Sequence, residues 1–535
     1  MPASYILAID LGTSSLKLAL VSTRGDVAGF ATRTLPISYL PDGGCEQDPE
    51  EWWKAICSAT RELVESKVVP VDDIIGISCT TTWSGTVALG GDDKPLMPCI
   101  MWMDSRGAPH IKKLFGGFPE VEGYNVPRLL KWIRLTGGVP GMSGKDSIAH
   151  ILFLKNERPE LYRATKKFLE PMDYLNFCFT GKCAASFATI TLHWATDNRD
   201  LSKVQYSESL LQTLGVERAK LPDLLPAGSV LGPLRAEAAR ELGLSEKVQV
   251  VMGTPDIQAA AVGSGAVRDG EAHLCVGTSS WIIAHLPYKK SDLFHNMATL
   301  PSAIPNRYIV TNEQESAAGA LNFLKDSLLF PADELNTVAP ADAHQTFSTM
   351  AARIPPGSGG LLFTPFLNGE RSPVDDRSVR ASFVNLSLTT TRAHLVRSVM
   401  EGVAFNSKWL FGFVEKFMGK RVPEVTIIGG GARSDVWCQI FADVLDRPLR
   451  QVKDPVMANS RGAAFIGANA LGKLAFDDVP ALVPIAKTWA PDVKNRRIYD
   501  ELFTEFLHVY RSTSKVCARL NRLSTSLETG TQESS

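Results

Sequence analysis

Short apolar runs separated by turn residues open the chain. Apolar runs at 5–10, 15–21 and 27–34 are divided by Gly-Thr-Ser-Ser and Thr-Arg-Gly-Asp turns, which predicts three successive strands. Residues 48–66 begin with an Asp-Pro pair and two glutamates, a pattern typical of a helix N-terminus. Another apolar run follows at 74–80. Strands that alternate with helices at this spacing predict an α/β domain with a mixed sheet.

The opening pattern is repeated in the second half of the chain. Residues 272–286 again form an apolar run, a Gly-Thr-Ser-Ser turn and a second apolar run. A repeated strand-turn-strand at the start of two α/β halves predicts two related domains, over residues 1–265 and 266–480. We expect a helical extension over 481–522 and disorder over 523–535, which has few apolar residues.

Three further segments carry clear local signals. Helical patterns occupy residues 145–163 and 388–416. Residues 424–445 are typical of a strand, a glycine turn and a helix. These patterns extend the alternation of strands and helices into both halves.

Composition and charge narrow the possible partners. Hydrophobic residues make up 44% of the 535-residue chain and charged residues 21%, as in ordinary globular proteins, and this length favours two domains. The 56 basic and 57 acidic side chains give a formal net charge of −1, which argues against broad binding to nucleic acid or an anionic membrane. No apolar run approaches the roughly 20 residues that cross a bilayer. The N-terminus lacks the basic segment of a signal peptide.

The cysteines point to a reducing compartment. There are nine, an odd number, and no Cys-x-x-Cys pair occurs, which is poor material for a disulfide framework or a zinc site. We therefore expect a cytoplasmic protein with no nucleic acid and no membrane among its partners.

Neither common nucleotide-binding loop is present. The chain has no Gly-x-x-x-x-Gly-Lys-[Ser/Thr] loop, and no Gly-x-Gly-x-x-Gly opens a helix after a strand. The two Gly-Thr-Ser-Ser turns offer another way to hold phosphate, because glycine lets backbone N–H groups converge on an anion and the hydroxyls add donors. Asp10 precedes the first turn and offers the oxygen ligands that Mg2+ prefers, with water completing the shell. Lys17 is either a phosphate ligand or a surface charge. For each Gly-Thr-Ser-Ser turn considered alone, a plain β-turn is the alternative interpretation.

Asp256 and a run of glycines mark two further candidate positions. Asp256 follows an apolar run at 248–253 and opens an alanine-rich helical pattern, so it lies at the carboxyl end of the sheet, where α/β folds bind ligands. The helix N-terminus favours its ionised form, which removal of a proton from an alcohol requires. A helix N-cap is the alternative role. Residues 429–432, Gly-Gly-Gly-Ala, have almost no side chains. Backbone without side chains either lets a flat ring or a phosphate approach closely or forms a tight structural turn.

Together these segments resemble the FGGY carbohydrate kinases, the sugar- and glycerol-phosphorylating branch of the actin-like ATPase superfamily. The resemblance runs from about residue 5 to about residue 475, through AIDLGTSSLKLAL, GGCEQDPEEWW, IMWMDSRG, DYLNFCFTGK, GTPDIQAAAVGSG, CVGTSS, NGERSP, RAHLVRSVMEGVAF and GGGARSDVWCQIFADVLDRPL. Within the family the pattern is most similar to the xylulose kinases. The resemblance implies an α/β fold of two actin-like (ribonuclease H-like) domains, each a mixed sheet flanked by helices, with a cleft between them.

The resemblance also implies the cofactors and the roles of individual residues. ATP and Mg2+ would bind in the cleft, Asp10 matches the magnesium-associated acid, and Asp256 matches the base that acts on a sugar hydroxyl. Lys17 is a candidate phosphate ligand beside the first loop. The positions that match the two phosphate loops and the adenosine-binding turn are Gly12, Thr13, Ser14, Gly277, Thr278, Gly430, Gly431 and Ala432.

The segments that would face the acceptor are the least typical of the family. Trp102 lies where a tryptophan lines the polyol pocket. Trp83 falls in Thr-Thr-Trp-Ser-Gly, where xylulose kinases carry a Gln-Met-His-Gly-like segment and glycerol kinases an Arg-Glu pair. The base of the family is normally followed by Asn or Gln; here Ile257 follows it, and Gln258 comes one place later, about 100° further around the helix. The candidate substrate-binding residues are Trp83, Trp102, Asp256 and Gln258.

The resemblance predicts transfer of the γ-phosphoryl group of ATP to a hydroxyl of a ketose such as D-xylulose, with Asp256 as general base. The same chemistry on ribulose, erythritol or another polyol, or glycerol is the main alternative. A non-catalytic sugar sensor and an actin- or chaperone-type ATPase are the others. The intact Asp10 and Asp256 count against the sensor, and the sugar-kinase segments count against the ATPase. The expected partner is a small sugar or polyol, and a homodimer is compatible with the family.

Overall fold

The first half of the chain is built around a six-stranded mixed sheet. The computed structural model describes residues 4–335 and 338–530. The strand order in this sheet is β16-β17-β6-β1-β2-β3, in which β1, β6 and β17 run parallel and the others antiparallel to their neighbours. Its strands are β1 (Tyr5–Leu11), β2 (Ser15–Ser22), β3 (Val27–Thr34), β6 (Ile74–Thr81), β16 (Val230–Pro233) and β17 (Gln249–Pro255).

The second half is built around an eight-stranded mixed sheet of order β20-β21-β22-β19-β18-β25-β26-β27. Its strands are β18 (Ala272–Val276), β19 (Ser280–Leu286), β20 (Ser291–Asp292), β21 (Met297–Pro301), β22 (Tyr308–Thr311), β25 (Val425–Ile428), β26 (Leu449–Val452) and β27 (Ile485–Trp489). Because β27 pairs with β26, the segment predicted as a helical extension from residue 481 also supplies the edge strand of this sheet.

The two sheets follow one plan. From β3 to β16, and from β22 to β27, two antiparallel pairings are followed by two parallel pairings and a final antiparallel one. The central strand β1 is buried along nearly its whole length, as expected where helices cover both faces of a sheet. This architecture confirms the predicted α/β fold of two actin-like domains with mixed sheets flanked by helices.

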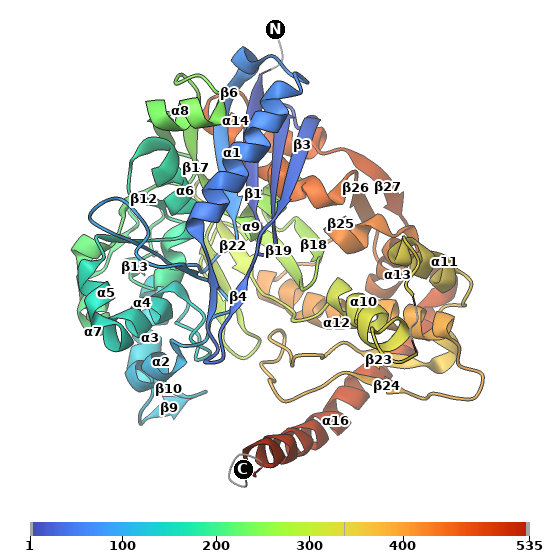
Figure 1. Ribbon diagram of the computed structural model, residues 1–535. Coiled ribbons are helices and arrows are strands. Elements are labelled where there is room, and N and C mark those ends of the chain that lie inside the picture. Colours follow the sequence, from blue (N-terminus) through green and yellow to red (C-terminus); the bar gives the residue numbers. More distant parts are fainter. Residues whose placement is uncertain (1–3, 336–337, 531–535) are drawn as a thin grey trace.

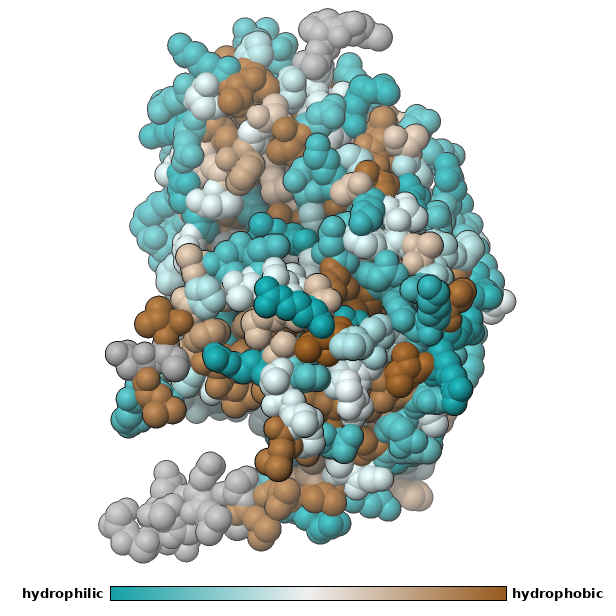
Figure 2. All heavy atoms as spheres, turned by 90° about the vertical axis from the view of Figure 1, so that its right-hand side faces the viewer, coloured by the Kyte–Doolittle hydropathy of each residue, from teal (hydrophilic) through white to brown (hydrophobic). Residues whose placement is uncertain are grey.

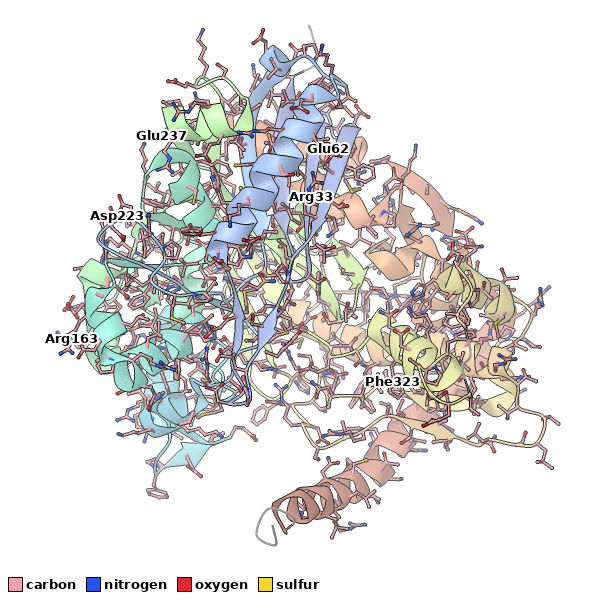
Figure 3. The ribbon with its side chains drawn as sticks, viewed as in Figure 1. Arg33, Glu62, Arg163, Asp223, Glu237 and Phe323 are labelled. Carbon is pink, nitrogen blue, oxygen red and sulfur yellow. The ribbon has the colours of Figure 1, made fainter. Side chains whose placement is uncertain are left out.

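Helices cover the outer faces of both sheets (Figure 1). On the first sheet, α1 (Pro49–Glu65) contacts α6 (Pro171–Thr180) and α8 (Ala236–Leu242). Arg33 of β3 and Glu62 of α1 form an ion pair on the surface, with Nη2 and Oε2 2.6 Å apart (Figure 3). The second sheet carries α12 (Arg392–Met418) and α13 (Asp435–Leu445), with α11 (Ala343–Ala352) and α16 (Arg496–Gly530) packed against them.

The part of the chain that follows β6 and precedes β17 in the sequence forms a helical lobe, which lies beside the first sheet, on the left in Figure 1. Its helices are α2 (Ala108–Phe115), α3 (Val126–Thr136), α4 (Ser147–Glu157), α5 (Pro159–Ala164) and α7 (Glu208–Leu214). Its short strands are β7 (Val87–Leu89), β8 (Cys99–Ile100), β9 (Glu120–Val121), β10 (Tyr124–Asn125), β11 (Lys167–Leu169), β12 (Ala184–Ser186), β13 (Thr196–Asp197), β14 (Gln205–Tyr206) and β15 (Asp223–Leu225). The remaining elements are β4 (Ser38–Tyr39), β5 (Cys45–Gln47), α10 (Ala318–Phe323), β23 (Leu362–Thr364), β24 (Ser382–Val384) and α15 (Val479–Leu482).

Two helices join the halves. α14 (Ala458–Ala470) comes from the second half and packs on β1, β2, β6 and β17 of the first sheet. α9 (Asp256–Ser264) comes from the first half and contacts β18, β19 and β25 of the second sheet. The two helices meet at Gly263 and Gly462: a Cβ on Gly462 would overlap the carbonyl oxygen of Ala259, and a Cβ on Gly263 that of Ala458. Glycine at both positions allows this close backbone approach.

The C-terminal helix ends later than the predicted boundary at residue 522. α16 runs through Gly530, because extending an existing helix costs little compared with starting one. Asn521 anchors it, since its Nδ2 donates to the carbonyl of Ser378 at 2.7 Å. Of the region expected to be disordered, residues 531–535 lie outside the described residues.

Large apolar side chains are exposed at scattered places on the surface, among them Phe118, Phe294 and Leu388. Figure 2 shows that hydrophilic residues predominate on the face of the second half, with hydrophobic residues singly or in small groups. Within residues 4–335 and 338–530, no helix is both long enough and apolar enough to span a bilayer.

Candidate active site

The first predicted phosphate loop is the turn between β1 and β2. The N–H of Gly12 donates to the carbonyl at the start of β2 at 3.0 Å. Nε2 of Gln47 donates to the carbonyl of Thr13 at 2.6 Å, and Nε1 of Trp102 donates to Oγ1 of Thr13 at 3.0 Å. Ser14 is exposed at the tip of the turn. The turn is therefore held in place by side chains from outside the hairpin and exposes one hydroxyl.

The second predicted phosphate loop occupies the equivalent position between β18 and β19. The carbonyl of Gly277 accepts a hydrogen bond from the N–H of Ala318 at 2.8 Å. The carbonyl of Thr278 accepts from the N–H groups of Ala317 at 2.8 Å and Gly319 at 3.1 Å. Thr278 itself is exposed. The repeat seen in the sequence is therefore also a repeat in the structure.

The predicted adenosine-binding turn lies beside the second phosphate loop. β25 runs parallel to β18, so the loops that follow them emerge at the same edge of the sheet. A Cβ on Gly431 would lie 2.5 Å from Cγ1 of Val276, the last residue of β18, so a side chain there is excluded. Gly430 is exposed, and a Cβ there would meet nothing within 4 Å. Ala432 is buried, and its carbonyl accepts from Nε2 of Gln451 at 2.8 Å. Of the three residues, Gly430 is therefore the one that faces open space.

Asp10 and Asp256 lie at the carboxyl edge of the first sheet. β1 and β17 flank β6; Asp10 stands near the end of β1, and Asp256 opens α9 directly after β17. Asp10 is 2% exposed, and its Oδ2 lies 3.3 Å from Nζ of Lys17. Lys17 is thus part of this cluster and not an isolated surface charge.

The carboxyl of Asp256 has an unusual environment. Its pKa is raised to about 7, first by burial and next by the negative charge of Asp10, with a smaller contribution from Glu313. The backbone N–H of Ile257, which donates to Oδ1 at 2.8 Å, and the charge of Lys17 act in the opposite direction. A carboxyl with this pKa changes its protonation state near neutral pH, as a general base requires.

The donor set around Asp10 fits Mg2+ only together with a nucleotide. Among the residues that the structure describes, no group of three or more His, Cys, Asp or Glu could hold a metal ion. Mg2+ is commonly held by one or two carboxylates together with phosphate oxygens and water. Asp10 would therefore hold the ion of a metal–nucleotide complex, and that ion would neutralise charge on the phosphate oxygens.

Trp102 reaches the predicted site directly, and Trp83 lies in the loop beside it. Trp102 touches the first phosphate loop through its hydrogen bond to Thr13. Trp83 is half-buried, and its Nε1 donates to the carbonyl of Thr189 at 3.0 Å. The loop that carries Trp83 is joined to the end of β1 by the N–H of Thr82, which donates to the carbonyl of Leu11 at 2.9 Å.

Gln258 does not reach the site. Its side chain is 0% exposed, Nε2 donates to the carbonyl of Pro301 at 3.0 Å, and Oε1 accepts from Oγ1 of Thr254 at 3.1 Å. Both ends of the amide are therefore used inside the protein. The prediction that Gln258 binds substrate is corrected here: the additional helix position turns it toward the core, where it links α9 to β17 and β21.

Sequence reasoning missed a charged cluster in the second half that faces Trp102. The Arg371 guanidinium pairs with Glu313 and Glu315, and its central carbon lies 5.8 Å from the centre of the Trp102 ring. Arg371 belongs to the NGERSP segment, which was recognised as a motif without a role. No local signal indicates that the loop of Glu313 meets the loop of Arg371, because 56 residues separate Arg371 from Glu315.

Glu370 organises both loops of this cluster. It is 1% exposed, and its Oε1 accepts from the backbone N–H groups of Glu315 at 2.9 Å and Arg371 at 2.8 Å. Its Oε2 accepts from Nδ2 of Asn406 at 2.5 Å. Burial raises the pKa of Glu370 to about 7, although these three donors favour the carboxylate.

We expect Glu370→Gln to destabilise the protein. The amide keeps the shape of the side chain but turns an NH2 group toward one of three donors, which leaves a buried hydrogen-bonding group unsatisfied. The free energy of unfolding, measured by urea denaturation, should fall by about 2 kcal/mol. Glu62→Gln in the exposed pair with Arg33 is the control and should change it by less than about 1 kcal/mol. Equal effects of the two substitutions would contradict the role of Glu370.

Family models match both halves of the chain, and several known proteins are similar to it over nearly its full length. The model of the "FGGY family of carbohydrate kinases, N-terminal domain" matches residues 5–263, and the model of the C-terminal domain of that family matches residues 272–471. The xylulose kinase of Staphylococcus epidermidis is 27% identical over 527 residues, which cover 97% of this chain and 99% of the relative. The gluconokinase of Bacillus subtilis is 27% identical over 511 residues, which cover 95% and 96%. The crystal structure of the xylulose kinase from Rhodospirillum rubrum superposes with a TM-score of 0.81 at 27% identity, covering 96% of this chain and 99% of that one.

Proposed function

The chain belongs to the FGGY family of carbohydrate kinases and is an ATP-dependent sugar kinase, and we propose that its acceptor is a ketose such as D-xylulose. The proposal of a ketose follows the xylulose kinases among its relatives. A sugar acid is the second candidate, because a gluconokinase is equally similar to the chain. Other polyols and glycerol use the same chemistry.

We assign the general base to Asp256, and this assignment rests chiefly on its position and its raised pKa. Asp256 takes the proton of the acceptor hydroxyl as that oxygen forms a bond to the γ-phosphorus. The bond between this phosphorus and the bridging oxygen of ATP breaks, and ADP leaves with the electron pair. Catalysis in such a transfer comes mainly from positioning and electrostatic stabilisation.

We propose that the two glycine hairpins and the glycine turn hold ATP. Backbone N–H groups at Thr13 and Ser14, and at Thr278, would receive the phosphates from opposite sides. The N–H groups of Gly12 and Gly277 close the two turns by donating to the carbonyls of Ser15 and Ser279, each at 3.0 Å. Gly430 would leave space for the adenosine. Lys17 pairs with Asp10 and adds positive charge beside the first loop.

The raised pKa of Asp256 gives a specific expectation for the pH profile. The base acts only when ionised, so kcat/KM should be level above pH 7 and fall about tenfold for each unit below it. Initial rates between about pH 5 and pH 9 at low acceptor concentration test this. A profile that stays flat down to about pH 5 would contradict Asp256 as the base with this pKa.

The experiment that tests the proposed function is an assay of ADP release with a panel of acceptors. The panel contains D-xylulose, D-ribulose, erythritol, glycerol and D-gluconate, and each reaction is compared with one that lacks acceptor. The largest kcat/KM with D-xylulose supports the proposal, and the largest with D-gluconate overturns the ketose in favour of the sugar acid. ADP release that needs no acceptor would support an ATPase instead. Acceptor binding without release would support a sugar sensor.

A further inference from the structure

Trp102 lies in both of the proposed binding regions. Its indole ring is half-buried and is a candidate contact for the acceptor, and its Nε1 donates to Oγ1 of Thr13 at 3.0 Å. Thr13 belongs to the proposed first phosphate loop. One side chain therefore connects the place where a sugar would stack with the place where ATP phosphates would bind.

The rest of Thr13 is held by a separate, rigid support. Nε2 of Gln47 donates to the carbonyl of Thr13 at 2.6 Å and to that of Pro36 at 3.2 Å. Oε1 of Gln47 accepts from Nε1 of Trp52 at 3.2 Å, and both side chains are buried. The Thr13 backbone is thus fixed independently of Trp102, whereas the direction of its hydroxyl depends on the indole N–H. A change in Trp102 can reorient this hydroxyl without unfolding the loop.

The second half of the chain also reaches the indole ring, through Arg371. Arg371 lies 5.8 Å from the ring centre, and its guanidinium is held by Glu313 and Glu315. Glu370 orders both of those loops through backbone N–H groups. A cation near an aromatic face is attracted to it, so Arg371 gives the second half of the chain a contact with Trp102.

We propose that the Trp102–Thr13 hydrogen bond couples acceptor binding to nucleotide binding, and that Arg371 is the positioning residue that holds the indole from the other half. An acceptor that packs on the indole would fix its N–H on Thr13 and so hold the Thr13 hydroxyl in one direction beside the phosphates. Coupling between sites is reciprocal, so nucleotide binding strengthens acceptor binding by the same factor. This inference rests on the proposed function, since it requires a sugar and a nucleotide in neighbouring sites.

The coupling is measured as the ratio of the MgADP dissociation constants without and with saturating D-xylulose, by titration calorimetry on the full-length protein. We expect Trp102→Phe, which keeps a ring but removes the N–H donor, to lower this ratio about fivefold. Thr13→Val removes the acceptor and should lower it equally, whereas Thr13→Ser should retain it. The ratio of the double variant, Trp102→Phe with Thr13→Val, should be no lower than that of either single variant, because both substitutions remove the same hydrogen bond. Additive losses, or a wild-type ratio in Trp102→Phe, would overturn the proposal.

Trp53→Phe is the matched control. The half-buried indole of Trp53 also donates one hydrogen bond, but to Oε2 of Glu241 at 2.5 Å, between α1 and α8 and away from the phosphate loop. This exchange should leave the ratio within about twofold of wild type. Arg371→Met removes the guanidinium and keeps much of the side-chain length. It should lower the ratio in the wild-type background and have no further effect once Trp102 is Phe.

A sugar-free measurement separates this inference from the choice of acceptor. If Trp102 reports on the phosphate loop, MgADP alone should change the protein's tryptophan fluorescence. That change should shrink in Trp102→Phe and persist in Trp53→Phe. If D-xylulose does not bind but the fluorescence result is as expected, only the proposed acceptor fails, and the ratio is measured with the best acceptor of the panel. If the fluorescence change is the same in wild type and both variants, the link between Trp102 and Thr13 fails.

Discussion

Asp256→Asn is expected to lower kcat about a thousandfold and to leave the affinity for MgADP within about twofold of wild type. Asn has the shape of Asp but cannot accept the proton of the acceptor hydroxyl, so the reaction loses its general base. The nucleotide is proposed to bind through the glycine turns and Asp10, which the substitution leaves intact. A coupled assay of ADP release gives kcat, and titration calorimetry gives the affinity.

The same substitution should raise the melting temperature. The pKa of Asp256 is about 7 in the folded protein, against an ordinary value of 3.8, so the folded state holds this proton more tightly than the unfolded chain does. The ionised carboxylate therefore costs stability, and this cost grows as the pH rises from 3.8 to about 7 and is constant above that. At about pH 8, Asn removes the buried charge, and differential scanning calorimetry should show a higher Tm.

Asp48→Asn is the control for a purely structural role of Asp256. Asp48 caps α1, where its side chain accepts from the N–H of Glu50 at 2.9 Å. Asn and Asp cap helices about equally well. If Asp256 served only to start α9, Asp256→Asn would be as harmless as Asp48→Asn. Near-normal turnover of Asp256→Asn would thus remove Asp256 from the proposed mechanism.

Gly462→Ala is expected to have the largest effect on stability. The added methyl group would overlap the carbonyl oxygen of Ala259, so α14 and α9 would have to move apart. Forcing extra volume into a tight contact between backbones should lower the free energy of unfolding by about 3 kcal/mol. Because Asp256 begins α9, the displacement should also lower kcat roughly tenfold or more. Urea denaturation and the ADP-release assay measure the two effects.

Gly412→Ala is the matched control for this prediction. Gly412 lies within α12, is exposed, and would meet nothing within 4 Å if it carried a Cβ. Alanine has the higher helix propensity, so this substitution should stabilise the protein by up to about 1 kcal/mol and leave kcat unchanged. Similar effects of the two Gly→Ala substitutions would show that the crossing of α9 and α14 tolerates a side chain.

Local patterns in the sequence predicted most of the secondary structure near the site. The runs at 5–10, 15–21 and 27–34 are β1, β2 and β3, and residues 48–66 contain α1. These elements were predictable because hydrophobic periodicity and turn residues act over a few neighbouring positions. The helical pattern at 145–163 is broken into α4 and α5, where Pro159 begins the second helix.

The side-chain partners of the site were less predictable. Asp10 and Asp256 could be placed because Asp10 is near the end of β1 and Asp256 directly follows β17, and parallel strands end at a common edge. Gln258 was misplaced because a single helix position decides between the cleft and the core, and only packing against Pro301 and Thr254 settles it. Glu370 and Arg371 stood in a recognised motif, but their partners come from another loop and from the other half of the chain.

By itself, the sequence determined the family, the repeated strand-turn-strand hairpins, and the carboxylates at the strand ends. Only the tertiary structure decided that α9 and α14 cross at two glycines, that Gln258 is buried, and that Trp102 links Thr13 to Arg371. The physical reason is one of range. Turns, strands and helix starts depend on the covalent neighbourhood, whereas charge pairs and hydrogen bonds between segments far apart in the chain depend on where two domains place their loops.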